Sequence, residues 1–192
     1  MTACLDGFTA HAVEVQADIG LGLPSFALVG LTDRAVQEAR ERVRSALRNS
    51  DFGFPQHRLT VNLAPAELRK EGTGFDLAIA VAILREGGLK PTFPEAGFIG
   101  ELGLDGGVRR TRGVLPMCLR LAADGVSPIF VPYMLKSWWW ITRTFRSCDA
   151  RFLILIFRTK IGRWKSTTSL QYICNRRSRC SRLTLAVRVS RR

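Results

Sequence analysis

Apolar and polar residues alternate in several short stretches of the first 132 residues. The clearest is residues 12–19, where every odd position is apolar, and this two-residue period predicts a half-buried strand. The turn at residues 20–24 (Gly-Leu-Gly-Leu-Pro) separates it from a short apolar run at residues 25–30, which we expect to form a second, more buried strand. Further strands are predicted at residues 59–63 and 129–131.

The next segment has the spacing of a helix. Between residues 36 and 47 the apolar side chains fall at i, i+3, i+7, i+10 and i+11, which predicts one amphipathic helix with Thr32 or Asp33 as its cap. Its other face is rich in Arg and Glu, and Glu38 and Arg42 are spaced as a favourable i,i+4 pair. We expect these charged side chains to face solvent.

Two more helices follow. The first begins at Asp76, which we expect to cap it, and ends at residues 87–88; because it is apolar almost all round, it should be buried against the sheet. The second is predicted at residues 113–123. Between them, residues 98–104, an Asp-Gly-Gly turn and Val108 have the pattern of a hairpin. Interleaved strands and helices with one hairpin indicate an α/β (α+β) fold.

Composition divides the chain near Pro132. The whole chain has 192 residues, 46% of them hydrophobic, and a net charge of +13. Residues 1–132 carry 14 basic and 15 acidic residues, whereas residues 133–192 carry 15 basic residues and the single acid Asp149. We therefore expect a domain at residues 1–132 and a separate, poorly ordered Arg- and Trp-rich tail at residues 133–192.

Compartment and membrane signals are few. The five cysteines include no C-x-x-C pair, and the first residues lack the pattern of a signal peptide, so we expect a cytoplasmic protein. The longest apolar run, residues 152–157, has six residues between Arg151 and Arg158, whereas a membrane-spanning helix needs about 20. We expect no membrane partner.

The most suggestive local motif is the turn at residues 70–76. Its glycines could leave amides free for an anion or let another chain approach closely, or the turn could simply join a strand to a helix. The residues that we single out as a possible interaction site are Lys70, Glu71, Gly72, Gly74 and Asp76.

Several chemistries lack their motifs. G-x-x-x-x-G-K-[ST] has no match, so the sequence encodes no phosphate-binding loop of that kind. His11 and His57 stand far apart without a metal-ligand spacing, and no G-x-S-x-G is present. We expect no metal site, no cofactor and no catalytic residue in this chain.

Nine short stretches form one ordered series along the chain: residues 11–15, 22–26, 29–31, 40–44, 61–65, 70–72, 75–77, 100–102 and 112–116. In this order they resemble the amino-terminal domain of one known family, the magnesium-chelatase-like AAA+ ATPases of the ComM type. The resemblance implies a fold like domain 2 of ribosomal protein S5, shared with the proteolytic domain of Lon. It also implies continuation into an ATPase module that uses ATP and magnesium, hexameric rings, and action on DNA during natural transformation.

The likeness to Lon raises the possibility of a peptidase. Lon uses a serine and a lysine, and the resemblance places Gly74 and Leu115 at those two positions. Neither residue can act as a nucleophile or a base. We therefore expect a non-catalytic domain, truncated before the ATPase module, with a Lon-like peptidase as the weakest alternative.

The resemblance stops near Pro132, and two interpretations of the tail remain. Residues 133–192 could be the product of a shifted reading frame. Alternatively, they could form a nucleic-acid-binding arm in a freestanding basic protein, with Trp138–Trp140 stacking on bases. The candidate phosphate contacts of that arm include Arg176, Arg177, Arg179 and Arg182.

Overall fold

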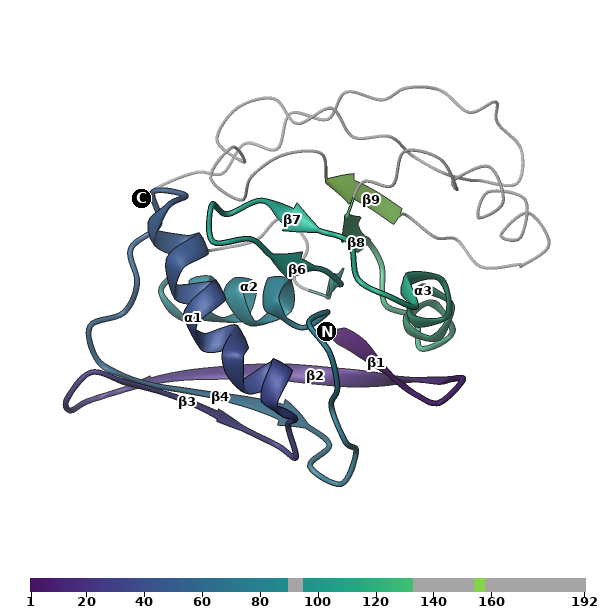
Figure 1. Ribbon diagram of the computed structural model, residues 1–192, viewed down its shortest axis with the longest axis horizontal. Helices are drawn as coiled ribbons and strands as arrows, with labels where there is room; N and C mark the ends of the chain where they lie inside the picture. Colours follow the sequence, from purple (N-terminus) through teal and green to yellow (C-terminus); the bar gives the residue numbers. More distant parts are fainter. Residues whose placement is uncertain (90–94, 133–153, 158–192) are drawn as a thin grey trace.

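A four-stranded sheet forms the base of the molecule. The computed structural model describes residues 1–89 and 95–132, together with the backbone of β9 (Ile154–Phe157). The sheet contains β1 (Thr2–Asp6), β2 (Thr9–Gly20), β4 (Arg58–Ala64) and β3 (Ser25–Val29), in that spatial order. Figure 1 shows α1 (Arg34–Arg48) and α2 (Asp76–Glu86) on one face of this sheet.

The segment β3–α1–β4 is a parallel crossover, as the sequence predicted. β3 pairs with β4 in parallel, and α1 buries its five apolar positions against the sheet. Residues 25–30 were expected to form the more buried strand, but only one of its faces is buried. β3 is the edge strand, where Phe26 and Leu28 are buried while Ser25, Ala27 and Val29 face outward.

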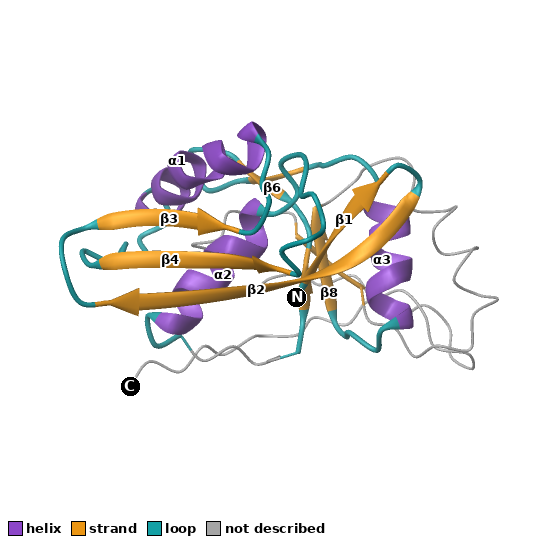
Figure 2. Cartoon of the chain, turned by 90° about the horizontal axis from the view of Figure 1, so that it is seen from below, coloured by secondary structure: helices purple, strands orange, loops and turns teal. Residues whose placement is uncertain are grey.

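The hairpin of β1 and β2 was not predicted. β1 pairs with the first half of β2, from Thr9 to Val13, while β4 pairs with the second half, from Glu14 to Gly20. The β1 end of the hairpin extends away from β3 and β4 toward α3 (Val114–Ala123) (Figure 2). The run Thr-Ala-Cys-Leu-Asp lacks an alternating pattern because both of its faces are covered, so periodicity could not detect it.

Shorter strands complete the other side of the molecule. β5 (Gly97–Phe98) and β9 pair with β8 (Ile129–Pro132), and all three strands are parallel. The predicted Asp-Gly hairpin is confirmed as β6 (Glu101–Leu102) and β7 (Val108–Arg109), with Phe98 in the separate strand β5. Gly106 has a φ of +80° in its turn, a conformation that glycine adopts without a Cβ penalty.

Two hydrophobic clusters flank the β1–β2 hairpin. The large cluster lies between the sheet and the helices α1 and α2, and includes Cys4, Val13 and Leu77. The small cluster surrounds α3 and includes Ala3, Leu121 and Ile129. Because side chains alternate along a strand, neighbouring residues of β1 such as Ala3 and Cys4 enter different clusters.

One part of the tail differs from expectation. Residues 133–192 were predicted to lack order, yet the four residues of β9 form a strand beside β8. The rest of the tail, including the four arginines of the proposed arm, lies outside the described residues. Mixed sheets with three helices confirm the α+β class. Within the described part of the chain, no helix has the length and hydropathy needed to cross a membrane.

Candidate functional site

Residues 70–76 join β4 to α2 and pack against the start of α1. The Asp33 amide donates to the Lys70 carbonyl at 3.1 Å, and the Lys70 amide donates to the Leu31 carbonyl at 3.0 Å. Asp33, rather than Thr32, caps α1: its Oδ1 accepts from the Val36 amide at 2.8 Å. Its Oδ2 accepts from the Gly72 amide at 3.2 Å. The sequence suggested that amides of this turn could bind an anion. In the structure, the Asp33 carboxylate of the protein itself binds the Gly72 amide.

Asp76 is fully buried and holds three parts of the molecule together. Its carboxylate accepts from Arg42 Nε at 2.6 Å and Nη2 at 3.0 Å, and from the Leu102 amide at 3.1 Å. Burial raises the pKa of the Asp76 carboxyl, while the Arg42 guanidinium opposes that shift. The hydrogen bond to Asp76 raises the pKa of Arg42, which keeps the guanidinium charged.

Two expectations about these residues were wrong. Asp76 does not cap α2, because the cap position is Phe75 and no side chain bonds to the helix start there. Arg42 does not face solvent or pair with Glu38, which binds Arg34 instead at 3.1 Å. One signal could have indicated the pair: an acid at the start of an otherwise apolar, buried helix requires a cationic or hydrogen-bonding partner.

The segment that leads into β6 closes the turn from the other side. The Gly100 amide donates to the Gly74 carbonyl at 3.0 Å, and the Leu77 amide donates to the Gly100 carbonyl at 3.0 Å. The Thr73 hydroxyl donates to Glu101 Oε2 at 2.5 Å. We call residues 70–76, with Asp33, Arg42 and Glu101, the junction.

Lys70 lies inside the fold. Its side chain is fully buried, and its Nζ donates to the Pro65 carbonyl. Desolvation lowers the pKa of this amine, with Cys4 as an opposing neighbour. Burial in turn raises the pKa of the Cys4 thiol to about 11.

The structure thus brings all five predicted site residues into one turn, but only part of that turn reaches the surface. Lys70, Gly74 and Asp76 are buried, Gly72 is half-buried, and Glu71 is exposed. Glu71 pairs with the exposed Arg69 at 2.8 Å. A partner that approached the turn would therefore meet Glu71 and Gly72 rather than the lysine.

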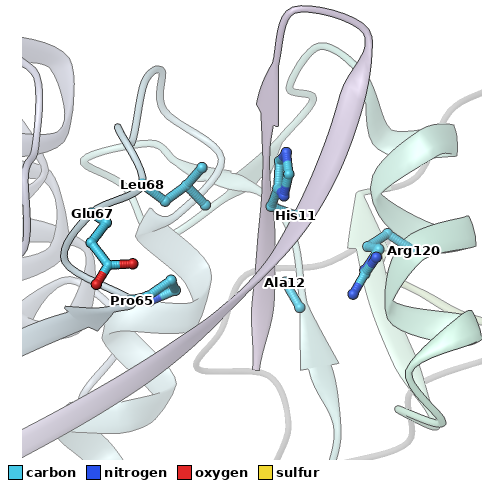
Figure 3. A pocket seen from close by; sticks show the side chains of 6 residues that line it. All are labelled: His11, Ala12, Pro65, Glu67, Leu68 and Arg120. Atoms are coloured by element: carbon cyan, nitrogen blue, oxygen red, sulfur yellow. The ribbon is translucent and has the colours of Figure 1, made fainter.

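A shallow cavity of about 320 Å³ lies near the junction and was not predicted (Figure 3). It is lined by three separate segments: His11 and Ala12 on β2, the loop after β4, and Arg120 on α3. Pro65, whose carbonyl receives the Lys70 amine, forms part of the wall. Arg120 also pairs with Asp124 at 2.9 Å. Because these residues are distant in sequence and form no motif, no sequence pattern indicated the cavity.

The positions that the resemblance matched to the Lon serine and lysine lie in buried or half-buried backbone. Gly74 sits beside Thr111, whose Oγ1 would stand 3.3 Å from a Cβ at Gly74. Leu115 lies in the first turn of α3 and packs on the small cluster. Among the described residues, no group of three or more His, Cys, Asp or Glu could hold a metal ion.

Comparisons with known proteins agree with this domain. A protein of Mycobacterium tuberculosis without an assigned function is 45% identical over 128 residues, covering 66% of this chain and 25% of its own length. Competence protein ComM of Haemophilus influenzae is 44% identical over 115 residues, covering 59% of this chain and 23% of its own. YifB of Escherichia coli is 42% identical over 121 residues, covering 62% of this chain and 24% of its own length. The chain thus spans about a quarter of the length of these relatives.

A family model extends this relationship across most of the described fold. The model for subunit ChlI of Mg-chelatase matches residues 13–134, from β2 to just beyond β8. The chain therefore belongs to the family of the Mg-chelatase subunit ChlI and is related to ComM and YifB.

Proposed function

We propose that residues 1–132 act as the non-catalytic amino-terminal domain of a ComM-type AAA+ ATPase. In this proposal the domain has the fold of ribosomal protein S5 domain 2 and contributes to assembly or substrate handling beside the motor. The family match over residues 13–134 is the observation that carries the proposal. The name of the Haemophilus relative, a competence protein, supports a role in transformation, for which we propose action on DNA in the cytoplasm.

The contacts of the junction support a structural rather than a catalytic role. Arg42 of α1 and Asp76 of α2 form an ion pair, and Asp76 also accepts from the Leu102 amide. Asp33 accepts from the amides of Val36 and Gly72. The Lys70 amine is buried against a carbonyl, with no exposure to solvent. A catalytic nucleophile or base must reach a substrate atom, which these groups do not. Gly74 and Leu115 supply neither function.

ATP and magnesium, which the family implies, do not fit the described residues of this chain. The sequence has no G-x-x-x-x-G-K-[ST] loop to cradle phosphates. The described residues also contain no cluster of carboxylates, cysteines and histidines for a metal ion. We therefore propose that nucleotide chemistry belongs to a separate module in the relatives, where this domain would sit beside it.

Exchange of domains tests this role. A chimera would carry residues 1–132 of this chain in place of the matching segment of Haemophilus ComM, in a strain that lacks its own copy. We expect the chimera to restore transformation. Asp124→Ala should leave it active because that ion pair is exposed, whereas Asp76→Ala should reduce transformation by destabilising the domain. A folded chimera without any transformation would contradict the proposal.

A second candidate function rests on the charge of the tail. Residues 133–192 hold 15 basic residues and one acid, a composition that binds phosphates in a salt-dependent manner. In this alternative, Arg176, Arg177, Arg179 and Arg182 contact nucleic acid.

Charge neutralisation in the full chain separates the two functions. Replacing those four arginines by serine should reduce the slope of log K against log salt by roughly 3–4 if each contacts a phosphate. The matched control replaces four exposed arginines of the domain, Arg34, Arg48, Arg58 and Arg110. Equal slopes in both variants would remove the alternative.

A further inference from the structure

The loop between β2 and β3, at residues 21–24, exposes two leucines. Leu21 is 94% exposed and Leu23 is 88% exposed, so both side chains are almost fully accessible to solvent. The loop is fixed at its base, because β2 and β3 both pair with β4 at Arg58, where the loop begins and ends. Single exposed apolar side chains are common on protein surfaces. Two of them on one fixed loop form a small projecting apolar surface, and we call residues 21–24 the apolar loop.

The cavity described above offers a matching apolar surface. Its wall is apolar at Ala12, Pro65 and Leu68 (Figure 3). An apolar cavity of about 150 Å³ holds a benzene molecule, so a cavity of about 320 Å³ has room for at least one leucine side chain. The molecule thus carries both an apolar projection and a hollow of suitable size.

The apolar loop cannot enter the cavity of its own chain. Ala12 lines the cavity and Gly20 precedes the loop, and both belong to the continuous strand β2. About eight steps of extended strand, at about 3.3 Å each, separate the two residues by roughly 26 Å. Figure 2 shows the loop at one end of β2, whereas α3, which carries Arg120 of the cavity, lies near the other end. A copy of this loop that fills the cavity must therefore come from another molecule.

The charges beside the loop and beside the cavity are complementary. Arg58 is exposed at the base of the apolar loop, and Glu67 is exposed at the cavity. Neither side chain forms an ion pair with another of the residues that the structure describes. Opposite charges on two surfaces favour their encounter and fix their register. The loop end of one molecule therefore matches the cavity end of another in charge as well as in apolar surface.

We propose that the apolar loop of one copy of this chain docks in the cavity of a second copy, with Leu23 against the apolar wall and Arg58 beside Glu67. The two surfaces differ, so the contact is head-to-tail and leaves an unused loop on one molecule and an unused cavity on the other. Repeated contacts of this kind close into a ring or continue as a filament. The inference rests on the assembly role in the proposed function and names the surfaces that carry it.

Photo-crosslinking between two copies tests the contact. The full chain with benzoyl-phenylalanine at position 23 is mixed with isotope-labelled wild-type chain, so that mass spectrometry separates crosslinks between molecules from those within one molecule. We expect crosslinks between molecules at residues 65–68. The matched control carries benzoyl-phenylalanine in place of Leu104, a leucine that is 57% exposed in the turn between β6 and β7. It should give no crosslink to the cavity.

Substitutions measure what each surface contributes. Replacing Leu21 and Leu23 together by serine should weaken self-association in analytical ultracentrifugation at least about tenfold, whereas Leu104→Ser should leave it unchanged. Arg58→Gln and Glu67→Gln should each lower the yield of the crosslink from position 23 roughly twofold to fivefold. The double variant should lose no more than one single variant does, because both substitutions remove the same ion pair.

Four outcomes would overturn the proposal. They are no crosslink between molecules from position 23 to the cavity across a concentration series, the same crosslink from position 104, unchanged self-association in the double serine variant, and additive losses in the Arg58 and Glu67 variants. All of the substituted side chains are exposed, so the core stays intact. If the crosslink is absent while the ComM chimera restores transformation, only this contact is refuted. If the crosslink is present while a folded chimera fails, only the proposed function is refuted.

Discussion

The two hydrophobic clusters differ in what holds their edges together. The large cluster contains the junction, where an ion pair and backbone hydrogen bonds tie α1, α2 and β6 to one another. The small cluster is apolar, and it takes Ile129 and Val131 from β8, a strand of four residues whose Phe130 enters the large cluster. We infer that polar groups determine the geometry of the first region, whereas packing on α3 and the pairing of β9 determine that of the second.

Removal of the Asp76 carboxylate should have the largest effect. Asp76→Ala removes the carboxylate partner of the largely buried Arg42, which keeps its hydrogen bond to the Ala35 carbonyl, and leaves the Leu102 amide without its acceptor. Breaking a buried ion pair in this way costs about 3–5 kcal/mol. Urea unfolding should show this loss, while Asp124→Ala at the exposed Arg120 pair should cost less than about 1 kcal/mol. Similar losses in the two variants would remove the distinction between the regions.

Truncation of Leu121 tests the small cluster. Leu121 is fully buried there, and Leu→Ala in a core costs about 2–5 kcal/mol. We expect a value near the lower end because the neighbours of a small cluster can close part of the cavity. Hydrogen exchange should accelerate at β5 and β8 before β2 and β4. Uniform acceleration across all four strands would show that the two clusters unfold as one.

Alkaline pH should destabilise the small cluster through Cys118. Burial raises the pKa of this thiol from 9.0 to about 12. Above pH 9 the unfolded thiol is ionised while the folded thiol keeps its proton, so the folded state binds one more proton. The free energy of unfolding then falls by about 1.4 kcal/mol per pH unit up to pH 12, and below pH 9 this contribution is fully present.

Cys118→Ala isolates that contribution. In urea unfolding between pH 8 and pH 10, the free energy of unfolding should fall more steeply for wild type than for the variant. The difference in free energy of unfolding between the two proteins should therefore narrow. The Cys4 thiol, whose pKa burial raises to about 11, titrates in both proteins and cancels from the comparison. Parallel pH profiles would contradict this assignment.

The smallest expected effect is at Gly72 in the junction. Its φ is +85°, and a Cβ there would meet no atom within 4 Å. Gly72→Ala should therefore cost only the backbone penalty, roughly 1–2 kcal/mol. Gly87 has an ordinary φ of −71° at the end of α2, so Gly87→Ala should be neutral or slightly stabilising. Thermal unfolding of the two variants distinguishes a conformational role of Gly72 from a packing role.

Local sequence patterns predicted the elements whose two faces differ. α1, β4 and the Asp-Gly hairpin were found because periodicity and turn residues report on a single element. β1 was missed because both of its faces are covered, and the edge position of β3 depends on a sheet order that no local pattern encodes. β9 was missed because its partner is distant in sequence.

The candidate site shows the same limit. The turn at residues 70–76 could be located from its glycines, but the exposure of its members could not. Lys70 and Asp76 have charged side chains, which are almost never fully buried without partners, and both are buried. Arg42 is 34 residues away from Asp76, so the pair became visible only in the folded chain.

The central claim is that the junction holds the domain together and performs no chemistry, and variants of the ComM chimera test it most directly. Lys70→Met, Glu71→Gln and Asp76→Asn would be compared for transformation and for the folded fraction of the isolated protein. We predict that transformation follows the folded fraction in all three, with Glu71→Gln unchanged because Glu71 is exposed. A fully folded Lys70→Met or Asp76→Asn chimera that has lost transformation would contradict the claim.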